Sequence, residues 1–292
     1  METKKKKDNE LLTIAIQKSG RLYEDSVKLL KECGIELNNG NKQLKSVASN
    51  FPLEIYFLRD DDIPQYIFDN VADVGIVGEN VLLEKNRDID LQFRLGFGKC
   101  RLSIAVPKSM KYDTVADLGG LKIATSYAHL LQQFLNDNNV EAEIHEISGS
   151  VEIAPGIGLA DAICDLVSSG STLFTNGLKE VEVVLNSEAV LAVNKGLSAA
   201  RQAILDKLLL RISAVKRAKS VKYILLNAPN HQLKNIAALL PGAKSPTIVP
   251  LAEEGWSSVQ SVVNENEFWE VIEKLKACEA EGILVVPIEK MI

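Results

Sequence analysis

One segment of the chain joins a buried strand to a run of small hydroxyl residues. The apolar stretch 162–167 is followed at once by Ser168, Ser169, Gly170, Ser171 and Thr172. Backbone N–H groups around a glycine can turn inward and approach an anion closely, and the hydroxyls add donors. A helix beginning near Leu173 would contribute a favourable partial charge. These residues predict a loop that holds a phosphate group.

Two carboxylates accompany this loop. Asp165 stands three residues before it, where it could accept hydrogen bonds from ribose hydroxyls while the loop holds a 5′-phosphate. Glu152 opens the same segment and is the second carboxylate. The alternative is a plain Ser/Gly turn, with Asp165 capping a local amide and Glu152 a solvated acid in the first turn of a helix.

Apolar runs alternating with helical stretches indicate how the loop is positioned. Before residue 96, strands are predicted at 11–16, 54–58 and 73–78. After residue 98 the pattern restarts, with strands predicted at 101–106, 121–125, 141–147 and 162–167 and a helix over 129–136. Apolar runs within 181–193 could return the chain to its first half. Two α/β lobes with mostly parallel strands follow, and such sheets bind ligands at their carboxyl ends.

A separate unit is predicted after a long helix over 198–217. Its strands are expected at 221–227, 246–251, 257–263 and 282–288, and its helices at 232–240 and 267–277. The order βαββαβ is that of ferredoxin-like domains. The predicted fold class is therefore α/β, bilobal as in type II periplasmic binding proteins, plus a C-terminal ferredoxin-like domain. The predicted boundaries are 1–105 with 181–219 for lobe I, 106–180 for lobe II and 220–292 for the last domain.

Composition excludes several classes of protein. A net charge of −6 argues against a general nucleic-acid binder, and no apolar run is long enough to cross a bilayer. The basic run 4–7 lacks the apolar stretch of a signal peptide. Four widely separated cysteines, Cys33, Cys100, Cys164 and Cys278, show neither metal-ligand nor CxxC spacing and suit a reducing compartment. We therefore expect a cytoplasmic protein with neither nucleic-acid nor membrane partners.

The hydroxyl-rich segment also resembles a family signature. The matching positions are Glu152, Gly158, Ala160, Ile163, Asp165, Leu166, Ser169, Gly170, Thr172 and Leu173. Their spacing is similar to that of the ATP phosphoribosyltransferases. The stretches QKSGRL, DVGIVG, LGFGKCRLSIAVP, IATSYAHLL and ILVVPIEKMI extend the resemblance over nearly the whole chain. One departure is Ser19, which separates Lys18 from Gly20 where many relatives have a Lys-Gly-Arg run.

The resemblance implies a reaction and its site residues. Adenine N1 of ATP would attack C1 of phosphoribosyl pyrophosphate, releasing pyrophosphate, as the first step of L-histidine biosynthesis. Magnesium would be held mainly by substrate phosphates, so no metal ligands are assigned. Residues 168–172 would hold the 5′-phosphate and Asp165 the ribose, and Glu152 would contact the ribose or the metal-bound pyrophosphate region. Arg21, Asp73 and Tyr127 would contact ATP; their alternatives are a surface charge, a turn cap and simple packing.

The resemblance also covers the C-terminal unit, which is similar to the histidine-sensing domain of the family's long form. It implies feedback inhibition by L-histidine and assembly of dimers into a hexamer. Ser245 and Thr247, in the turn AKSPT, offer hydroxyls for the amino acid, and Gly282 leaves room for it. The alternative is a domain that serves assembly only. Two rival functions stay open: a phosphoribosyltransferase that uses a different base, and a bilobal small-molecule sensor.

Overall fold

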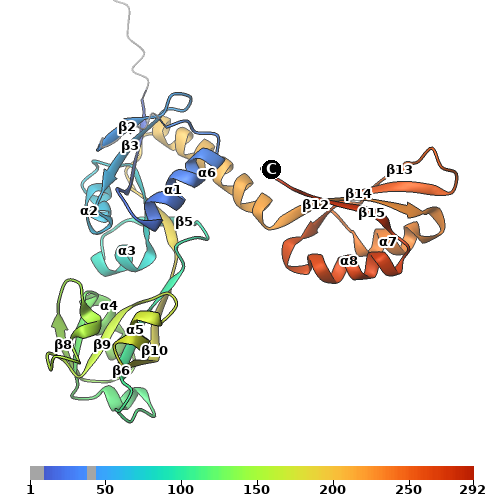
Figure 1. Cartoon of the computed structure of the whole chain (residues 1–292). Coiled ribbons are helices and arrows are strands. Elements are labelled where there is room, and N and C mark those ends of the chain that lie inside the picture. The colour runs from blue at the N-terminus through green and yellow to red at the C-terminus, as the bar shows by residue number, and fades with distance from the viewer. Residues whose placement is uncertain (1–9, 38–43) are drawn as a thin grey trace, which may run out of the picture. The chain divides into compact units, whose positions relative to one another are not determined.

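The computed structural model describes residues 10–37 and 44–292 (Figure 1). The chain divides into two compact units. The first runs to Ile204 without Glu32–Gly34, and the second comprises that short segment and Leu205–Ile292. The division falls inside the long helix α6 (Ala199–Lys219), so this helix contributes to both units.

The first unit contains a six-stranded sheet in the order β2-β3-β1-β4-β11-β5. Its strands are β1 (Leu12–Gln17), β2 (Lys45–Val47), β3 (Leu53–Leu58), β4 (Val74–Gly78), β5 (Asp90–Arg94) and β11 (Ala189–Val193). The central strands β3, β1 and β4 are parallel, and β11 joins β4 in the antiparallel sense. The helices α1 (Arg21–Glu32), α2 (Ile63–Phe68) and α3 (Glu79–Lys85) connect these strands. Five of the six residues of β1 are buried, as expected for a parallel strand covered on both faces.

The first unit also contains a five-stranded sheet in the order β10-β6-β9-β7-β8. Its strands are β6 (Cys100–Pro107), β7 (Lys122–Thr125), β8 (Glu143–Glu146), β9 (Ala162–Val167) and β10 (Leu178–Ser187). Strands β7, β8 and β9 are parallel, and α4 (Ala128–Asp137) and α5 (Ser171–Thr175) follow β7 and β9. The chain enters this sheet at β6 and passes from β10 back to β11 of the first sheet; residues 181–187 of the predicted return segment therefore lie in the second sheet.

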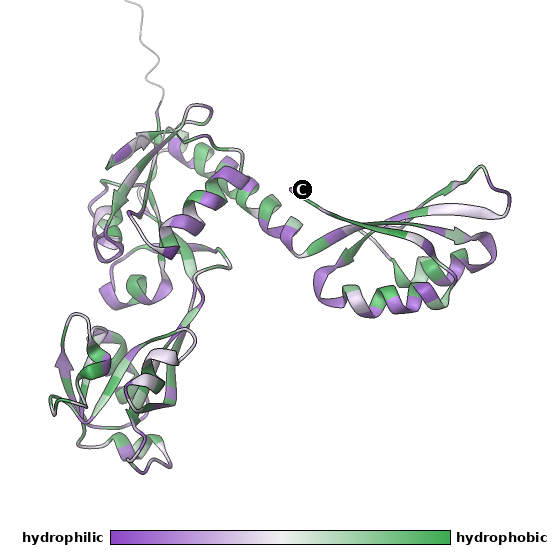
Figure 2. Ribbon diagram, viewed as in Figure 1, coloured by the Kyte–Doolittle hydropathy of each residue, from purple (hydrophilic) through white to green (hydrophobic). Residues whose placement is uncertain are grey.

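The second unit has the predicted βαββαβ order. Its elements are β12 (Val221–Pro229), α7 (Leu233–Leu239), β13 (Thr247–Pro250), β14 (Trp256–Asn264), α8 (Phe268–Ala277) and β15 (Glu281–Pro287). The antiparallel sheet has the order β13-β14-β12-β15, and the helices lie on one of its faces (Figure 1). Apolar residues of α8 alternate with polar ones (Figure 2), and Leu275 packs with Ile224, Ile236 and Val259. The predicted fold class is confirmed.

Several short elements were not predicted. Single turns of 3-10 helix lie at Asp60–Asp62, Val115–Leu118, Val151–Ile153, Asn230–Gln232 and Glu265–Glu267. Strand β5 exposes four of its five residues, so its polar sequence gives no apolar run. Helix α3 was missed because its seven residues are too few to show a helical period, although it contributes to the candidate site described below.

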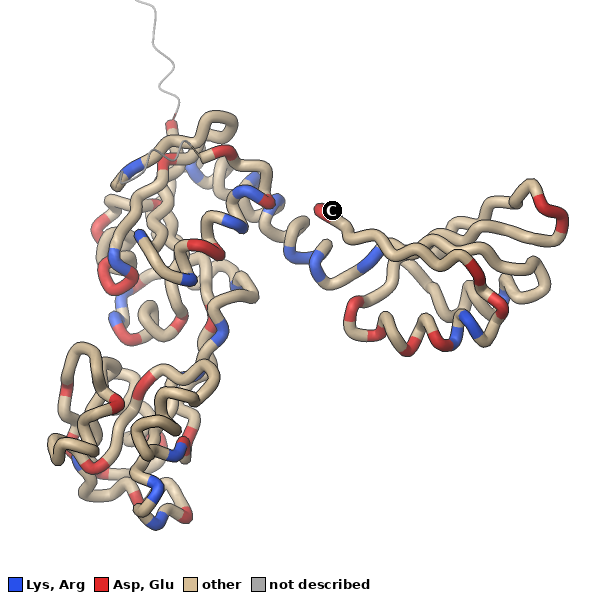
Figure 3. The backbone as a smooth tube through the Cα atoms, in the orientation of Figure 1, with Lys and Arg blue, Asp and Glu red and all other residues tan. Residues whose placement is uncertain are grey.

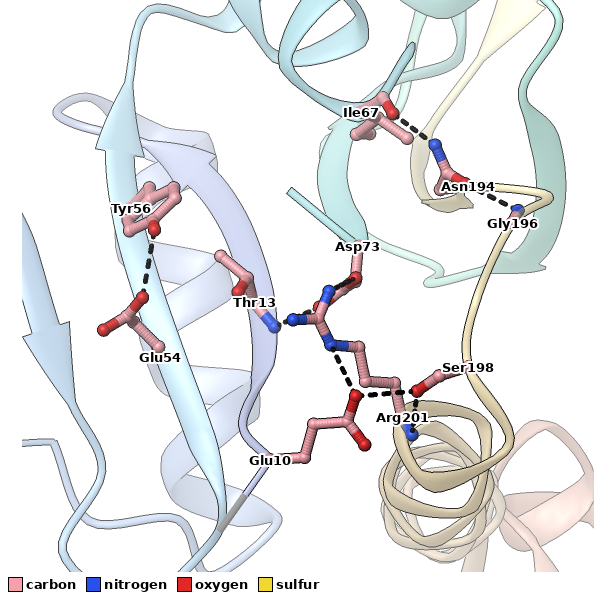
Figure 4. A network of polar contacts seen from close by, with 10 residues as sticks. All are labelled: Glu10, Thr13, Glu54, Tyr56, Ile67, Asp73, Asn194, Gly196, Ser198 and Arg201. Atoms are coloured by element: carbon pink, nitrogen blue, oxygen red, sulfur yellow. Dashed lines mark hydrogen bonds and ion pairs between the residues drawn. The ribbon is translucent and has the colours of Figure 1, made fainter. Parts of the chain in front are cut away.

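An ion-pair network joins the start of α6 to the first sheet (Figure 4). Asp73, which immediately precedes β4, is 6% exposed. One carboxylate oxygen accepts the Thr13 backbone N–H at 2.7 Å, and the other accepts Arg201 Nη1 at 2.8 Å. Ser198 Oγ accepts the Arg201 backbone N–H at 3.2 Å and donates to Glu10 at 3.0 Å. This network, the Asp73–Arg201 anchor, ties α6 to strands β1 and β4.

Loss of the arginine should destabilise the first unit. Arg201→Leu leaves the buried Asp73 carboxylate without its cation. We expect about 2 kcal/mol less free energy of unfolding, below the roughly 3–5 kcal/mol of a fully buried pair, because Arg201 is partly exposed. Urea denaturation measures this, with Lys207→Leu on the exposed face of the same helix as control. An equal loss in both variants would contradict a role for the anchor.

Candidate functional site

A cavity of about 620 Å³ lies between the two sheets of the first unit, and we call it the inter-sheet cleft. Side chains from both sheets line it: Asp60, Asp61, Val81, Glu84 and Lys85 on one wall, and Ser126, Tyr127, Glu146, Ile147, Ser148 and Gly149 on the other. Asp60 and Asp61 follow β3, Ser126 and Tyr127 follow β7, and Ile147 follows β8. The cleft therefore lies at the carboxyl ends of parallel strands, where α/β sheets bind ligands.

The hydroxyl-rich loop follows β9, which lies next to β7 in the same sheet. Gly170 has φ +78°, a left-handed conformation that glycine adopts without strain. Ser169 Oγ and Ser171 Oγ are 3.0 Å apart, and both residues are exposed. The helix that follows, α5, has only five residues, so its dipole adds less than the sequence suggested. The donors of this loop are chiefly backbone N–H groups and hydroxyls.

Arg101 and Glu180 brace this loop. The Arg101 guanidinium pairs with the Glu180 carboxylate and donates from Nη1 to the Ser168 carbonyl at 3.2 Å. The Ser103 hydroxyl donates to Glu180 at 2.7 Å. The hydrogen bonds from Arg101 lower the pKa of the Glu180 carboxyl, so Glu180 stays ionised. The sequence did not single out these residues, because an arginine and a glutamate on separate strands carry no local signal.

Glu152 and Asp165 lie close enough to interact electrostatically. Burial raises the pKa of the Asp165 carboxyl above its ordinary value, and the negative charge of Glu152 raises it further. The Leu166 backbone N–H donates to Asp165 Oδ1 at 2.7 Å and partly opposes this rise. The two carboxylates that the sequence placed beside the loop therefore influence each other electrostatically. An ionised Asp165 is costly here unless a ligand supplies further donors.

The three residues predicted to contact ATP fall in different places. Tyr127 lines the cleft, and its hydroxyl accepts a hydrogen bond from Asn80 Nδ2 at 3.0 Å. Arg21 is exposed at the start of α1, after β1, and so lies at the same sheet edge as Asp60. A cation at a helix N-terminus opposes the helix dipole, so the position brings no local stability.

Asp73 lies elsewhere. It precedes β4, whereas the cleft is at the carboxyl ends of the strands, and both its carboxylate oxygens are engaged in the Asp73–Arg201 anchor. The structure therefore does not bring Asp73 to the cleft, and the partners of its carboxylate, on β1 and α6, are not those of the turn cap given as the alternative. A direct contact with ATP by Asp73 stays a prediction that this geometry does not support.

The acidic side chains of the cleft bear on the expected magnesium. Acidic residues occur on both sheets of the first unit (Figure 3), and Asp60, Asp61, Glu84 and Glu146 line the cleft. Burial and the charge of Asp61 raise the pKa of the Asp60 carboxyl, a cost that a cation would offset. Among the described residues, no group of three or more metal-binding side chains converges. The chemistry fits Mg²⁺ held by substrate phosphates and one or two carboxylates.

The residues predicted to bind histidine do not converge within one chain. Ser245 precedes β13 and Thr247 begins it, and both are exposed. Gly282 lies on β15, at the opposite edge of the four-stranded sheet. Three strand spacings, roughly 14 Å, separate the two edges. A histidine site that includes Ser245, Thr247 and Gly282 together stays a prediction, and this separation within one chain does not support it.

Asn80 and Glu84 are contacts that the sequence analysis missed. They are four residues apart on α3, hence on one face of the helix, and both reach the first turn of α4. A polar pair at this spacing in ENVLLEK was the available signal. The sequence analysis assigns only a strand at 73–78 and no helix after it, so the pair has no predicted helix on which to lie.

Comparison with known proteins agrees with a bilobal α/β protein that carries a phosphate-binding loop, and it identifies the family. Residues 59–214 match the family described as ATP phosphoribosyltransferase, and 218–290 match the HisG C-terminal domain. The ATP phosphoribosyltransferase of Cytophaga hutchinsonii is 63% identical over 97% of this chain and 99% of that protein. That of Bacteroides fragilis is 56% identical over 97% of this chain and its own full length.

A solved structure agrees. The ATP phosphoribosyl transferase (HisG:HisZ) complex from Thermotoga maritima contains a chain with 28% identity and a TM-score of 0.59, covering 70% of this chain and 99% of that one. The chain belongs to the ATP phosphoribosyltransferase family, in its long form with the C-terminal domain. No helix in the described part of the chain is long and apolar enough to span a membrane.

The raised pKa of Asp165 has a consequence for stability. Because the folded pKa lies above the unfolded value, the ionised carboxylate costs stability at neutral pH, and protonation removes that cost. Asp165→Asn should therefore raise the free energy of unfolding at pH 7 without ligand. The gain should shrink as the pH falls through the raised folded pKa. Urea titrations at several pH values measure this, with Asp137→Asn, exposed on α4, as the matched control. A gain that is independent of pH would contradict the assignment.

Proposed function

We propose that this chain condenses ATP with phosphoribosyl pyrophosphate to give phosphoribosyl-ATP and pyrophosphate, the first step of L-histidine biosynthesis, in the cytoplasm. The observation that carries the proposal is the loop 168–172, with its left-handed glycine and exposed hydroxyls at the carboxyl end of β9. Membership of the family supports the identity of both substrates.

The loop would bind the 5′-phosphate of phosphoribosyl pyrophosphate. The segment 168–172 contains no lysine or arginine, so its donors to the phosphate would be amide N–H groups and the hydroxyls of Ser168, Ser169, Ser171 and Thr172. Asp165 would accept hydrogen bonds from the two ribose hydroxyls, which lower its raised pKa by favouring the charged form. Glu152, close to Asp165, would contact the ribose or the pyrophosphate region.

The inter-sheet cleft would hold ATP beside the ribosyl donor. Tyr127 offers an aromatic face on the cleft wall, and Arg21 supplies a guanidinium for phosphates at the same edge of the first sheet. Magnesium, when bound, would neutralise the pyrophosphate as it departs. The carboxylates of Asp60 and Asp61 are the protein groups that would meet it.

The chain's own contribution is alignment and electrostatics. The adenine N1 lone pair forms a bond to C1 of the ribosyl group, while the C1–oxygen bond breaks and its electron pair leaves with pyrophosphate. Adenine N1 is already a nucleophile, so no basic side chain is needed to activate it. Holding the two polyanions in line converts a bimolecular encounter into a reaction within one complex. The carboxylates of Asp165 and Glu152 would stabilise the positive charge that develops on the ribosyl ring.

Turnover and its dependence on the loop test this proposal. Purified protein mixed with ATP, phosphoribosyl pyrophosphate and magnesium should release pyrophosphate and form an adduct with new ultraviolet absorbance. Gly170→Ala forces a side chain into left-handed backbone, at a cost of about 1–2 kcal/mol, and should lower kcat/KM for phosphoribosyl pyrophosphate by roughly tenfold or more. Thr172→Val should raise KM for that substrate more than KM for ATP.

Three results would count against the assignment. Binding of ATP without turnover favours a sensor, and turnover with another base but not ATP favours a different phosphoribosyltransferase. A defect in Thr172→Val confined to ATP would show that the loop holds the other substrate. Ser220→Val, at the end of α6 and far along the chain from the loop, serves as the matched control.

We further propose that L-histidine inhibits the enzyme by binding the second unit at Ser245 and Thr247, and that dimers assemble into a hexamer. The support is the match to the C-terminal domain and the exposure of all four residues of β13. Inhibition requires that histidine bind one global state more tightly than another.

The double variant Ser245→Ala with Thr247→Ala tests the histidine site. Removal of both hydroxyls should weaken inhibition by at least tenfold while leaving activity without histidine near that of the wild type. Inhibition curves measure this, and Ser258→Ala on the neighbouring strand β14 is the control. Unchanged inhibition in the double variant would eliminate the site; calorimetry without histidine binding to the wild type would eliminate the regulation. Sedimentation that shows only monomer would contradict the assembly.

A further inference from the structure

Helix α3 reaches across the inter-sheet cleft to the first turn of α4. Asn80 Nδ2 donates to the Tyr127 hydroxyl at 3.0 Å. The two carboxylate oxygens of Glu84 accept the backbone N–H groups of His129 at 2.9 Å and Leu130 at 3.0 Å. Helix α3 follows β4 of the first sheet and α4 follows β7 of the second, so these three hydrogen bonds join the two lobes of the first unit.

Glu84 gives α4 a cap from outside its own lobe. The first N–H groups of a helix have no partner within it, and a residue at the N-cap position commonly supplies one. At the N-cap of α4 stands Tyr127, whose side chain makes no such bond within the described residues. The Glu84 carboxylate satisfies two of these N–H groups, and its negative charge is favoured at the positive end of the helix dipole. Two N–H groups at the start of α4 therefore have this partner only while the lobes are together.

Asn80, which contacts Tyr127, is also hydrogen-bonded to Ser187, where the chain crosses from the second lobe to the first. It is 4% exposed, and its backbone N–H donates to Ser187 Oγ at 3.1 Å. The Ser187 hydroxyl in turn donates to Asn80 Oδ1 at 2.9 Å. Ser187 ends β10, where the chain returns to the first sheet. A Cβ atom at Gly78 would stand 2.5 Å from Asn80 Oδ1, so a glycine at this position leaves room for the side-chain amide of Asn80.

We propose that Asn80 and Glu84 form an inter-lobe clasp that fixes the width of the cleft and the position of Tyr127 in it. The proposal rests on the proposed function, in which the cleft holds ATP. Glu84 and Tyr127 both line the cavity, so a change in their contact changes the wall that the nucleotide meets. Asn80 and Glu84 are positioning residues: they act through Tyr127 and the first turn of α4. When the lobes separate, the clasp opens and α4 loses its cap.

The test uses Glu84→Ala in the full chain, with Glu84→Gln as the conservative variant and Glu143→Ala, an exposed acid on β8, as the control. Hydrogen exchange of the peptide spanning the start of α4 should quicken by roughly tenfold in Glu84→Ala, the effect of losing a helix cap. ATP binding measured by calorimetry should weaken by a similar factor. Glu84→Gln keeps one acceptor oxygen and should fall between Glu84→Ala and the wild type in both measurements.

Each outcome decides between the proposals. Faster exchange with unchanged ATP affinity would show a cap that has no part in positioning, and unchanged exchange would show that the contact is absent in solution; either result overturns the clasp. If ATP binding depends on Glu84 as expected but the wild type forms no adduct, the proposed reaction is overturned and the clasp stands. A wild type that does not bind ATP would remove both.

Discussion

Parallel strands end at the same edge of a sheet, and the candidate site depends on that constraint in both lobes. In the first sheet the edge presents Arg21, Asp60 and the start of α3; in the second it presents Tyr127 and the loop 168–172. Backbone direction places these segments at the carboxyl ends of their strands, and of them Asp60, α3 and Tyr127 line the cleft. The Asp73–Arg201 anchor lies at the opposite end of β4, where an ion pair between the buried Asp73 and the partly exposed Arg201 stabilises the fold without intruding on the cleft.

Electrostatics explains why the site uses the donors that it does. The chain carries a net charge of −6, and carboxylates line the cleft, yet the proposed substrates are polyanions. Amides and hydroxyls bind phosphate without adding charge. Arg101 binds Glu180 and the Ser168 carbonyl and thereby stabilises the conformation of the loop. Burial raises the pKa of the Asp60 and Asp165 carboxyls, and the charges of Asp61 and Glu152 raise them further, so the ionised carboxylates are unfavourable at these positions. A divalent cation and ribose hydroxyls are the partners that such groups favour.

The second unit follows a different logic. Its sheet is covered by α7 and α8 on one face, and its edge strands β13 and β15 carry mostly exposed residues. An exposed edge strand can pair with or receive a partner, which agrees with a domain that senses a ligand or assembles with other copies. Because Thr247 and Gly282 lie on opposite edges, any one site in this unit is built around one edge and not both.

The sequence by itself determined the local features. The strands β1, β9 and β12 and the βαββαβ order follow from the periodicity of apolar residues. The loop 168–172 and Asp165 follow from residue types and spacing, because one strand and the turn after it are enough to bring them together. Only the tertiary structure decided which distant residues meet. The pairing of Arg201 with Asp73, the brace of Arg101 on Ser168 and the cap that Glu84 gives α4 join residues 128, 67 and 45 positions apart. Periodicity reports which face of an element is buried, but it carries no information about which element lies against that face.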